Sequence, residues 1–133
     1  MTKTALDTNI LVYLYDDTNL QKRNISESLI LETPLISTQV ISEYINVTKR
    51  LLRLPKIEVF DKCCQVFDKC RISPVSHQTL HLAKTLIQKY DFQLFDSIIV
   101  ASALEANCAV LYSEDFQHNQ LVEDKLRIIN PFL

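Results

Sequence analysis

The chain is organised around one stretch near its start, which reads Lys3-Thr4-Ala5-Leu6-Asp7-Thr8-Asn9-Ile10-Leu11-Val12-Tyr13. A short apolar run stops at Asp7, two small polar residues follow, and apolar residues then return at helical spacing. This pattern predicts a buried parallel strand that passes directly into a helix, with Asp7 at the carboxyl end of the strand. Ligands of open α/β sheets bind in the crevice outside these carboxyl ends, so Asp7 is a candidate functional residue.

The composition indicates one globular domain, residues 1–133, without a glycine-rich phosphate loop. The chain of 133 residues is long enough to bury one core, and its 47% hydrophobic and 23% charged residues are near the averages of globular proteins. It contains no glycine. Walker loops and dinucleotide-binding loops need glycine for close backbone approach to phosphate, so we expect no nucleotide cofactor.

The formal net charge of −2 gives no basic field of the kind that drives non-specific nucleic-acid binding. This charge argues against a passive nucleic-acid binder. It argues less against an enzyme that holds its substrate through metal ions.

The cysteines and the hydropathy indicate a cytoplasmic protein. The spacing of Cys63, Cys64, Cys70 and Cys108 matches neither a C-x-x-C motif nor a zinc finger, so we expect free thiols in a reducing compartment. The sequence shows no signal-peptide pattern and no apolar run of the ~20 residues that a membrane span needs. We therefore expect no membrane contact.

Strand and helix patterns alternate along the chain. Candidate strands after the first are Leu35-Ile36, a strand that begins at Ile72, Cys108–Tyr112 and Leu126–Ile129. Candidate helices are Ile10–Tyr15, Leu20–Leu31 capped by Asn19, Thr38 to about Arg53 opened by Ser37, Ile57–Cys70, His77–Lys89 capped by Ser76, and Phe95–Leu104. This alternation predicts one α/β domain whose mostly parallel sheet has about four to five strands, with helices on both faces.

Glu43 lies at the border of the apolar side of the helix that begins at Thr38. At ~100° per residue, one broad arc of this helix contains Val40, Ile41, Tyr44, Ile45, Val47, Leu51 and Leu52. Glu43 is therefore expected neither in the core nor freely solvated, but where the helix meets a cleft.

Four acids are predicted to reach one edge of the sheet. Asp115 follows the strand 108–112, Asp96 opens a buried helix, and Asp7 and Glu43 come from the elements described above. Carboxylates gathered in this way repel one another and have raised pKa values unless a cation neutralises them. Oxygen ligands suit Mg²⁺ or Mn²⁺ rather than zinc, and such a cluster fits the hydrolysis of phosphodiesters.

Each acid also has an ordinary structural interpretation. Asp7 could be a turn residue, Glu43 could lie at the border of an amphipathic helix, and Asp96 could be an acid that the helix dipole stabilises. Asp115 could belong to a loop or an Asx turn. Spacing alone does not decide between these interpretations and a metal site.

The motifs around the acids resemble those of a known family. Leu6-Asp7-Thr8-Asn9-Ile10-Leu11 looks like the opening of PIN-domain ribonucleases, especially the VapC-like toxins of toxin–antitoxin pairs. The segments 37–44, 95–103 and 112–118 resemble the family's other acidic motifs, and 127–132 resembles its usual ending. The resemblance covers essentially the whole chain in the right order.

The resemblance implies a PIN-like three-layer α/β/α fold and a Mg²⁺- or Mn²⁺-dependent endoribonuclease, the toxin of a type II toxin–antitoxin pair. Its catalytic and metal-binding residues would be Asp7, Glu43, Asp96 and Asp115. The partners it implies are an RNA substrate, a cognate antitoxin that covers the acidic site, and a second copy in a homodimer.

Three further positions follow from the resemblance. Asn9 and Ser113 match small polar positions that support the site by hydrogen bonding, and Asp115 rather than Glu114 matches the fourth acid. Asn119 stands where relatives often carry glycine, but asparagine also tolerates left-handed backbone angles.

The basic residues and the histidines have less specific interpretations. The densest basic stretch is Lys49, Arg50, Arg53 and Lys56. It is either a solvated helix face or a guide for the RNA backbone, with Lys49, Arg50 and Arg53 as candidate RNA contacts. The three histidines are expected to be surface groups: His77, His81 and His118.

Other classes of protein fit less well. A haloacid-dehalogenase-like phosphatase needs an acid where Asn9 stands, and a receiver domain needs an acid pair after the first strand. A catalytically silent PIN-like module that binds RNA or protein would be expected to have lost some of the four acids. A PIN nuclease of RNA processing also remains an alternative, although the short chain favours the toxin type.

Overall fold

Strand β1 (Thr4–Leu6) lies inside the sheet, and all of its residues are buried. It pairs in parallel with β2 (Leu35–Ser37) on one side and with β4 (Val110–Tyr112) on the other. The computed structural model describes residues 2–133. It confirms the predicted central strand that ends immediately before Asp7.

The sheet has six strands in the order β3-β2-β1-β4-β6-β5. β3 (Arg71–Ser73) pairs in parallel with β2, and β6 (Leu126–Ile129) pairs in parallel with β4. β5 (Gln120–Val122) lies at the edge and pairs antiparallel with β6. The mostly parallel α/β sheet is as predicted, and the predicted number of strands was approximate because β5 was not recognised.

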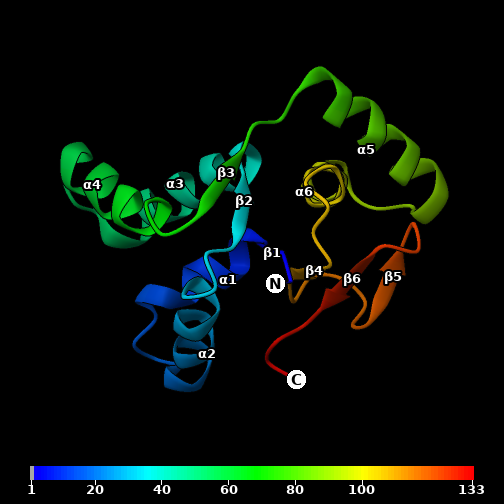
Figure 1. Ribbon diagram of the computed structural model, residues 1–133. Coiled ribbons are helices and arrows are strands. Elements are labelled where there is room, and N and C mark those ends of the chain that lie inside the picture. The colour runs from blue at the N-terminus through cyan, green and yellow to red at the C-terminus, as the bar shows by residue number, and fades with distance from the viewer. Residues whose placement is uncertain (1) are drawn as a thin grey trace.

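Six α-helices and one short 3-10 helix connect the strands. They are α1 (Thr8–Val12), η1 (Tyr13–Tyr15), α2 (Leu20–Ile30), α3 (Thr38–Leu52), α4 (Lys56–Phe67), α5 (His77–Tyr90) and α6 (Leu94–Glu105). Figure 1 shows α5 and α6 on one side of the sheet, α1 and α2 on the other, and α3 with α4 as an arm at the left. Within residues 2–133, no helix is both long and apolar enough to cross a membrane.

Polar side chains begin the helices at the positions that the sequence predicts. Asn19 accepts a hydrogen bond from the backbone N–H of Lys22, at 3.1 Å, and so caps α2. Ser37 caps α3 and Ser76 caps α5 in the same way. These caps satisfy backbone donors that a helix start otherwise leaves unpaired.

The glycine-free chain uses other residues where the backbone turns left-handed. Arg53 ends α3 with φ 51° and Asp91 ends α5 with φ 58°. Positive φ angles also occur at Thr33, Asn107, Asn119, Glu123 and Asp124. Asn119, with φ 69°, therefore adopts the left-handed conformation that its match to a glycine position suggested.

The apolar side of α3 is buried only in its first part. Val40 and Tyr44 are fully buried, whereas Leu51, which lies on the same predicted apolar arc, is 65% exposed. The last turns of α3 lie in the arm with α4, where fewer elements cover them. α4 ends at Phe67, before the Cys70 predicted from its pattern, because the chain turns there into β3.

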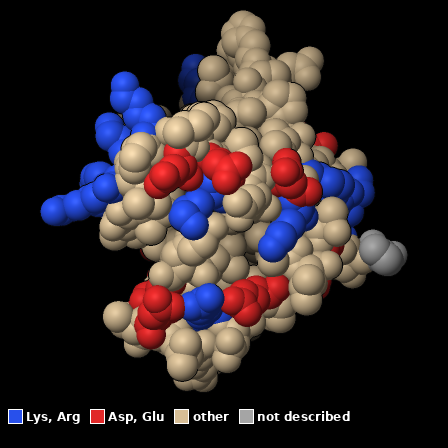
Figure 2. Space-filling model, turned by 90° about the vertical axis from the view of Figure 1, so that its left-hand side faces the viewer, with Lys and Arg blue, Asp and Glu red and all other residues tan. Residues whose placement is uncertain are grey.

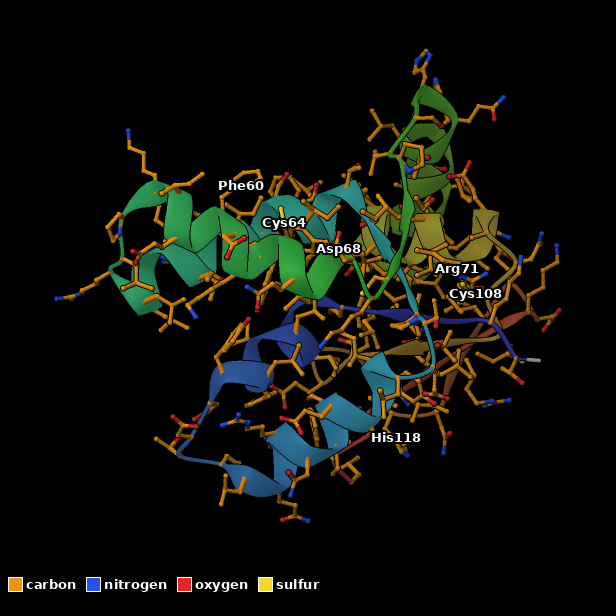
Figure 3. The ribbon with its side chains drawn as sticks, turned by 60° about the vertical axis from the view of Figure 1, so that its left-hand side comes forward. Phe60, Cys64, Asp68, Arg71, Cys108 and His118 are labelled. Carbon is orange, nitrogen blue, oxygen red and sulfur yellow. The ribbon has the colours of Figure 1, made fainter. Side chains whose placement is uncertain are left out.

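The four cysteines are free thiols, as predicted. Figure 3 shows Cys64 on α4 and Cys108 on the far side of the molecule, beside Arg71 of β3. The cysteines therefore contribute to packing and form no disulfide bonds.

Candidate active site

Asp7 is a buried carboxylate at the carboxyl end of β1. Its backbone N–H donates to the carbonyl of Tyr112 at 3.0 Å, which extends the pairing of β1 with β4 to this residue. Its Oδ1 accepts a 2.7 Å hydrogen bond from the N–H of Thr8, so Asp7 is also the N-cap of α1. The side chain is fixed by the strand behind it and the helix in front of it, with 3% of the residue exposed.

Ser113 joins two of the predicted acids. Its hydroxyl donates to Oδ2 of Asp7 at 2.7 Å and accepts from the backbone N–H of Asp115 at 3.1 Å. Its own N–H donates to the carbonyl of Ile129 at 3.0 Å, which anchors it between β4 and β6. Ser113 is fully buried, so this link between Asp7 and the Asp115 loop is shielded from water.

Asn9 also contacts Asp7 and Ser113, the two residues that this hydrogen bond joins. Its Nδ2 is 3.4 Å from both Oδ2 of Asp7 and Oγ of Ser113, and its Oδ1 accepts from the N–H of Glu114 at 3.4 Å. These contacts are long but connect the first turn of α1 to the loop after β4. Asn9 and Ser113 therefore both lie against Asp7.

Glu43 is held by two hydrogen-bond donors. Thr8 Oγ1 donates to Oε1 at 2.6 Å, and Gln39 Nε2 donates to Oε2 at 2.8 Å. Thr8 follows Asp7 directly, so the first and second acidic segments are joined through one hydroxyl. Thr8 and Gln39 were not predicted as site residues from the sequence, although Gln39 precedes Glu43 by one helical turn, a spacing that places side chains side by side.

Asp96 and Asp115 complete the set of predicted acids. Asp96 lies half-buried in the first turn of α6, and Asp115 is exposed in the loop after β4. Burial raises the pKa of Asp96, and the nearby charges of Asp115 and Glu43 raise it further. These repulsions show that Asp96 of α6 lies near Glu43 of α3 and near Asp115 in the loop after β4.

Burial raises the pKa of Asp7 to about 7. The hydrogen bonds from Ser113 and Thr8 oppose this shift, and the charges of Asp115 and Asp96 add to it. Repulsion between neighbouring carboxylates has this effect when no cation lies between them. The four predicted acids therefore form one electrostatically coupled group, which we call the acidic site.

No lysine or arginine neutralises the acidic site among residues 2–133. The ion pairs there join Lys22 to Glu114, Arg23 to Asp17 and to Glu27, and Lys89 to Glu123. All of these carboxylates lie outside the acidic site.

The donor chemistry of the acidic site fits a hard divalent cation. Its side chains offer carboxylate oxygens, which Mg²⁺ and Mn²⁺ prefer, and neighbouring hydroxyl and amide groups fix the direction of two of them. Within residues 2–133, however, no three acidic, histidine or cysteine side chains lie in an arrangement that could hold a metal ion without some movement.

Glu114 is turned away from the acidic site. Its Oε1 accepts a 2.6 Å hydrogen bond from the hydroxyl of Tyr13, and its Oε2 pairs with Nζ of Lys22 at 3.1 Å. Lys22 also lies over the rings of Tyr13 and Phe132, at 4.8 and 5.1 Å. This cluster fixes the loop after β4 against η1, α2 and the C-terminal end of the chain.

The candidate RNA contacts lie apart from the four acids. Lys49 and Arg50 occupy the last turn of α3 and Arg53 ends it, all exposed. Glu43 precedes Arg50 by seven residues, about 10 Å along the helix. Over the face shown in Figure 2, basic and acidic side chains are interspersed.

Comparison with known proteins identifies the fold. The family model described as the PIN domain matches residues 4–123, which is most of the chain. The chain belongs to the PIN domain family. No curated protein matches the sequence.

Solved structures of proteins from toxin–antitoxin systems share this fold. A toxin–antitoxin complex from Klebsiella pneumoniae superposes with a TM-score of 0.73 at 20% identity and covers 98% of both chains. DNA-bound VapBC from Salmonella typhimurium gives 0.72 at 15% identity, over 96% of this chain and 97% of that one. VapC20 of Mycobacterium tuberculosis, described as a toxin that cleaves the sarcin-ricin loop, gives 0.67 at 13% identity, over 85% and 92%. At these identities the likeness establishes the fold.

Proposed function

We propose that this PIN domain, residues 1–133, is a metal-dependent endoribonuclease and the toxin of a toxin–antitoxin pair. The observation that supports this most is the acidic site at the edge of the sheet where β1 and β4 end. There the charges of neighbouring acids contribute to the raised pKa values of Asp7 and Asp96, and no ion pair with a lysine or arginine is formed by the four acids within residues 2–133. The PIN fold and its toxin–antitoxin neighbours favour this function over a silent binding module or a nuclease of RNA processing.

In this proposal Asp7, Glu43, Asp96 and Asp115 hold Mg²⁺ or Mn²⁺. A divalent ion held by these residues would provide an activated water and would stabilise charge on the attacking and leaving oxygens of a phosphodiester. Ser113 and the N–H of Thr8 orient the carboxylate of Asp7 through 2.7 Å hydrogen bonds. Gln39 and the hydroxyl of Thr8 do the same for Glu43.

The histidines have no part in this mechanism. His77 and His81 lie on the exposed side of α5, and Nδ1 of His118 accepts a hydrogen bond from the N–H of Asn130. The proposed chemistry therefore uses carboxylates, hydroxyls and amides of this chain, without an imidazole as general acid.

The proposed partners follow from the related structures. The Salmonella and Rickettsia felis neighbours are VapBC assemblies bound to DNA, and the Klebsiella structure is a toxin–antitoxin complex. We extend this arrangement to the present chain as a proposal: a cognate antitoxin, a homodimer and a cytoplasmic location. Exposed Lys49, Arg50 and Arg53 are proposed contacts for the RNA backbone.

The test is cleavage of total RNA by purified protein, free of antitoxin, with Mg²⁺ or Mn²⁺. Discrete fragments are expected, and both EDTA and the substitution Asp7→Asn should abolish them. Asp68→Asn, an equally conservative change at the exposed residue that follows α4 (Figure 3), should leave cleavage intact. If the RNA stayed intact with Mg²⁺ and also with Mn²⁺, the proposal would be contradicted and the silent binding module would be favoured.

A further inference from the structure

Two histidines lie side by side on the exposed surface of α5. His77 is the first residue of the helix and His81 lies one turn later. Their Nε2 atoms are 3.2 Å apart, and their ring centroids are 4.7 Å apart. Both residues are exposed, so the two nitrogen atoms can be reached from solvent.

The first turn of α5, which carries His77, is stabilised by a capping box. Ser76 and Thr79 form a reciprocal capping box, with the N–H of Thr79 bonded to Ser76 Oγ at 3.2 Å and the N–H of Ser76 bonded to Thr79 Oγ1 at 3.0 Å. Thr79 is itself buried against the core. The capped turn therefore presents His77 and His81 at the spacing at which helical side chains meet.

The distance between the two nitrogen atoms matches the bite of a chelated metal ion. Bonds from imidazole nitrogen to zinc are about 2.0–2.1 Å long. Two nitrogen atoms 3.2 Å apart then subtend roughly 100° at the metal, between the right angle of square or octahedral geometry and the tetrahedral angle. Zinc proteases use the same i, i+4 arrangement of two histidines on one helix face.

The surroundings of the pair select the class of metal. The sequence of α5, His77–Tyr90, contains no aspartate or glutamate. Along the sequence, the charged residue nearest to the histidine pair is the exposed Lys84. The donors are therefore imidazole nitrogens without carboxylate support. Imidazole suits Cu²⁺, Ni²⁺ and Zn²⁺, whereas Mg²⁺ and Mn²⁺ prefer the oxygen ligands of the acidic site.

We propose that His77 and His81 form a second metal site, which takes one divalent transition ion of the imidazole-preferring class, Cu²⁺, Ni²⁺ or Zn²⁺. The ion links the first two turns of α5 and has its other coordination positions open to water. The site does not depend on the proposed nuclease function, because none of its atoms belongs to the acidic site. Without the ion, the 3.2 Å contact is a hydrogen bond between two imidazoles, which is the competing account of the pair.

Electron paramagnetic resonance of the full chain with one equivalent of Cu²⁺ tests the proposal directly. An excess of Mg²⁺ in the sample keeps copper from the carboxylates. The expected spectrum has nitrogen superhyperfine splitting from two imidazoles, and His77→Asn or His81→Asn should each reduce this to one. Asp7→Asn should leave the spectrum unchanged, which separates this site from the proposed nuclease site.

Calorimetric titration with Ni²⁺ supplies the affinity. Each single histidine variant should bind at least about tenfold more weakly, since losing even a supporting group of a metal site costs that much. His118→Asn is the matched control and should bind as the unsubstituted chain does. If the His77 and His81 variants bound Ni²⁺ as tightly as the unsubstituted chain does, or if the copper spectrum showed oxygen ligands alone, the proposal would be overturned and the pair would be a hydrogen-bonded couple only.

Discussion

Ser113 and Asp7 are 106 positions apart in the chain, yet the hydroxyl of Ser113 donates a 2.7 Å hydrogen bond to Oδ2 of Asp7. The bond links the ends of the adjacent strands β1 and β4, and the same hydroxyl accepts from the N–H of Asp115. Because the bond favours the charged form of Asp7, it lowers a pKa that burial raises. Ser113 therefore keeps a buried carboxylate closer to the ionised state that a metal ligand needs.

Replacing Ser113 should weaken metal binding. We expect Ser113→Ala to reduce the Mn²⁺ affinity by about 10–100-fold, as loss of a supporting hydrogen bond does at other metal sites. Titration calorimetry measures this change. Ser113→Thr keeps the hydroxyl and should retain more affinity than Ser113→Ala; equal affinities in the two variants would show that the hydroxyl does not support Asp7.

The raised pKa of Asp7 predicts how the stability of the metal-free protein depends on pH. In the unfolded chain Asp7 titrates near 3.8, and in the folded chain at about 7. Between these values the folded state binds more protons than the unfolded state, so the contribution of Asp7 to stability falls as the pH rises from about 4 to about 7. Above pH 7 the folded protein bears the full cost of a buried charge.

Asp7→Asn removes this titration. In EDTA, the variant should gain little stability over the unsubstituted chain at pH 4 and up to a few kcal/mol at pH 8. Thermal melts of both proteins across this range give the difference. A difference in melting temperature that stays constant with pH would contradict the raised pKa of Asp7.

The hydrogen bond from Tyr13 to Glu114 should contribute to stability by fixing the loop after β4. Tyr13→Phe removes the 2.6 Å bond while the ring can still pack against Phe132, whose centroid lies 5.1 Å away. We expect a loss of about 1 kcal/mol in the free energy of unfolding, measured by urea denaturation. Tyr15→Phe is the control, since its hydroxyl makes only a 3.4 Å contact with the carbonyl of Lys62 at an exposed site; an equal loss there would contradict a special role for Tyr13.

Thr33 is a β-branched residue with φ 52°, a backbone angle that costs such residues about 1–2 kcal/mol. Thr33→Gly should therefore stabilise the protein by about 0.5–1 kcal/mol, after the greater unfolded-state freedom of glycine is subtracted. Urea denaturation again gives the value. Glu32→Gly, at an exposed neighbour outside the positive-φ set, should be destabilising, and a gain in that variant instead would refute the explanation by backbone angle.

Local signals in the sequence were sufficient for most of the fold. The strand before Asp7 and the caps Asn19, Ser37 and Ser76 occur as predicted, because apolar runs and capping residues act over a few positions. β5 escaped prediction because its sequence, Gln120-Leu121-Val122, is not a clear apolar run and because residues on both sides of it, Asn119 and Glu123, have positive φ angles that end the strand. Its pairing with β6 supplies the regularity that its own sequence lacks.

The hydrogen bonds within the acidic site could not be predicted from the sequence and became visible only in the structure. The sequence predicted that the four acids share one sheet edge. The raised pKa values of Asp7 and Asp96, to which the charges of neighbouring acids contribute, agree with that arrangement. The hydrogen bond from Thr8 to Glu43 spans 35 positions, and no local pattern encodes it. The direction of Glu114 likewise depends on Tyr13 and Lys22, whose contact with the loop after β4 is created by folding.

The most direct test of the account is a calorimetric titration of Mn²⁺ into the unsubstituted chain and into Asp7→Asn, Glu43→Gln, Asp96→Asn and Asp115→Asn. The account predicts binding to the unsubstituted chain, at least about tenfold weaker binding to each of the four variants, and no change in Asp68→Asn. Absence of Mn²⁺ binding, or affinities that these four substitutions leave unchanged, would contradict the claim that the acidic site holds the metal.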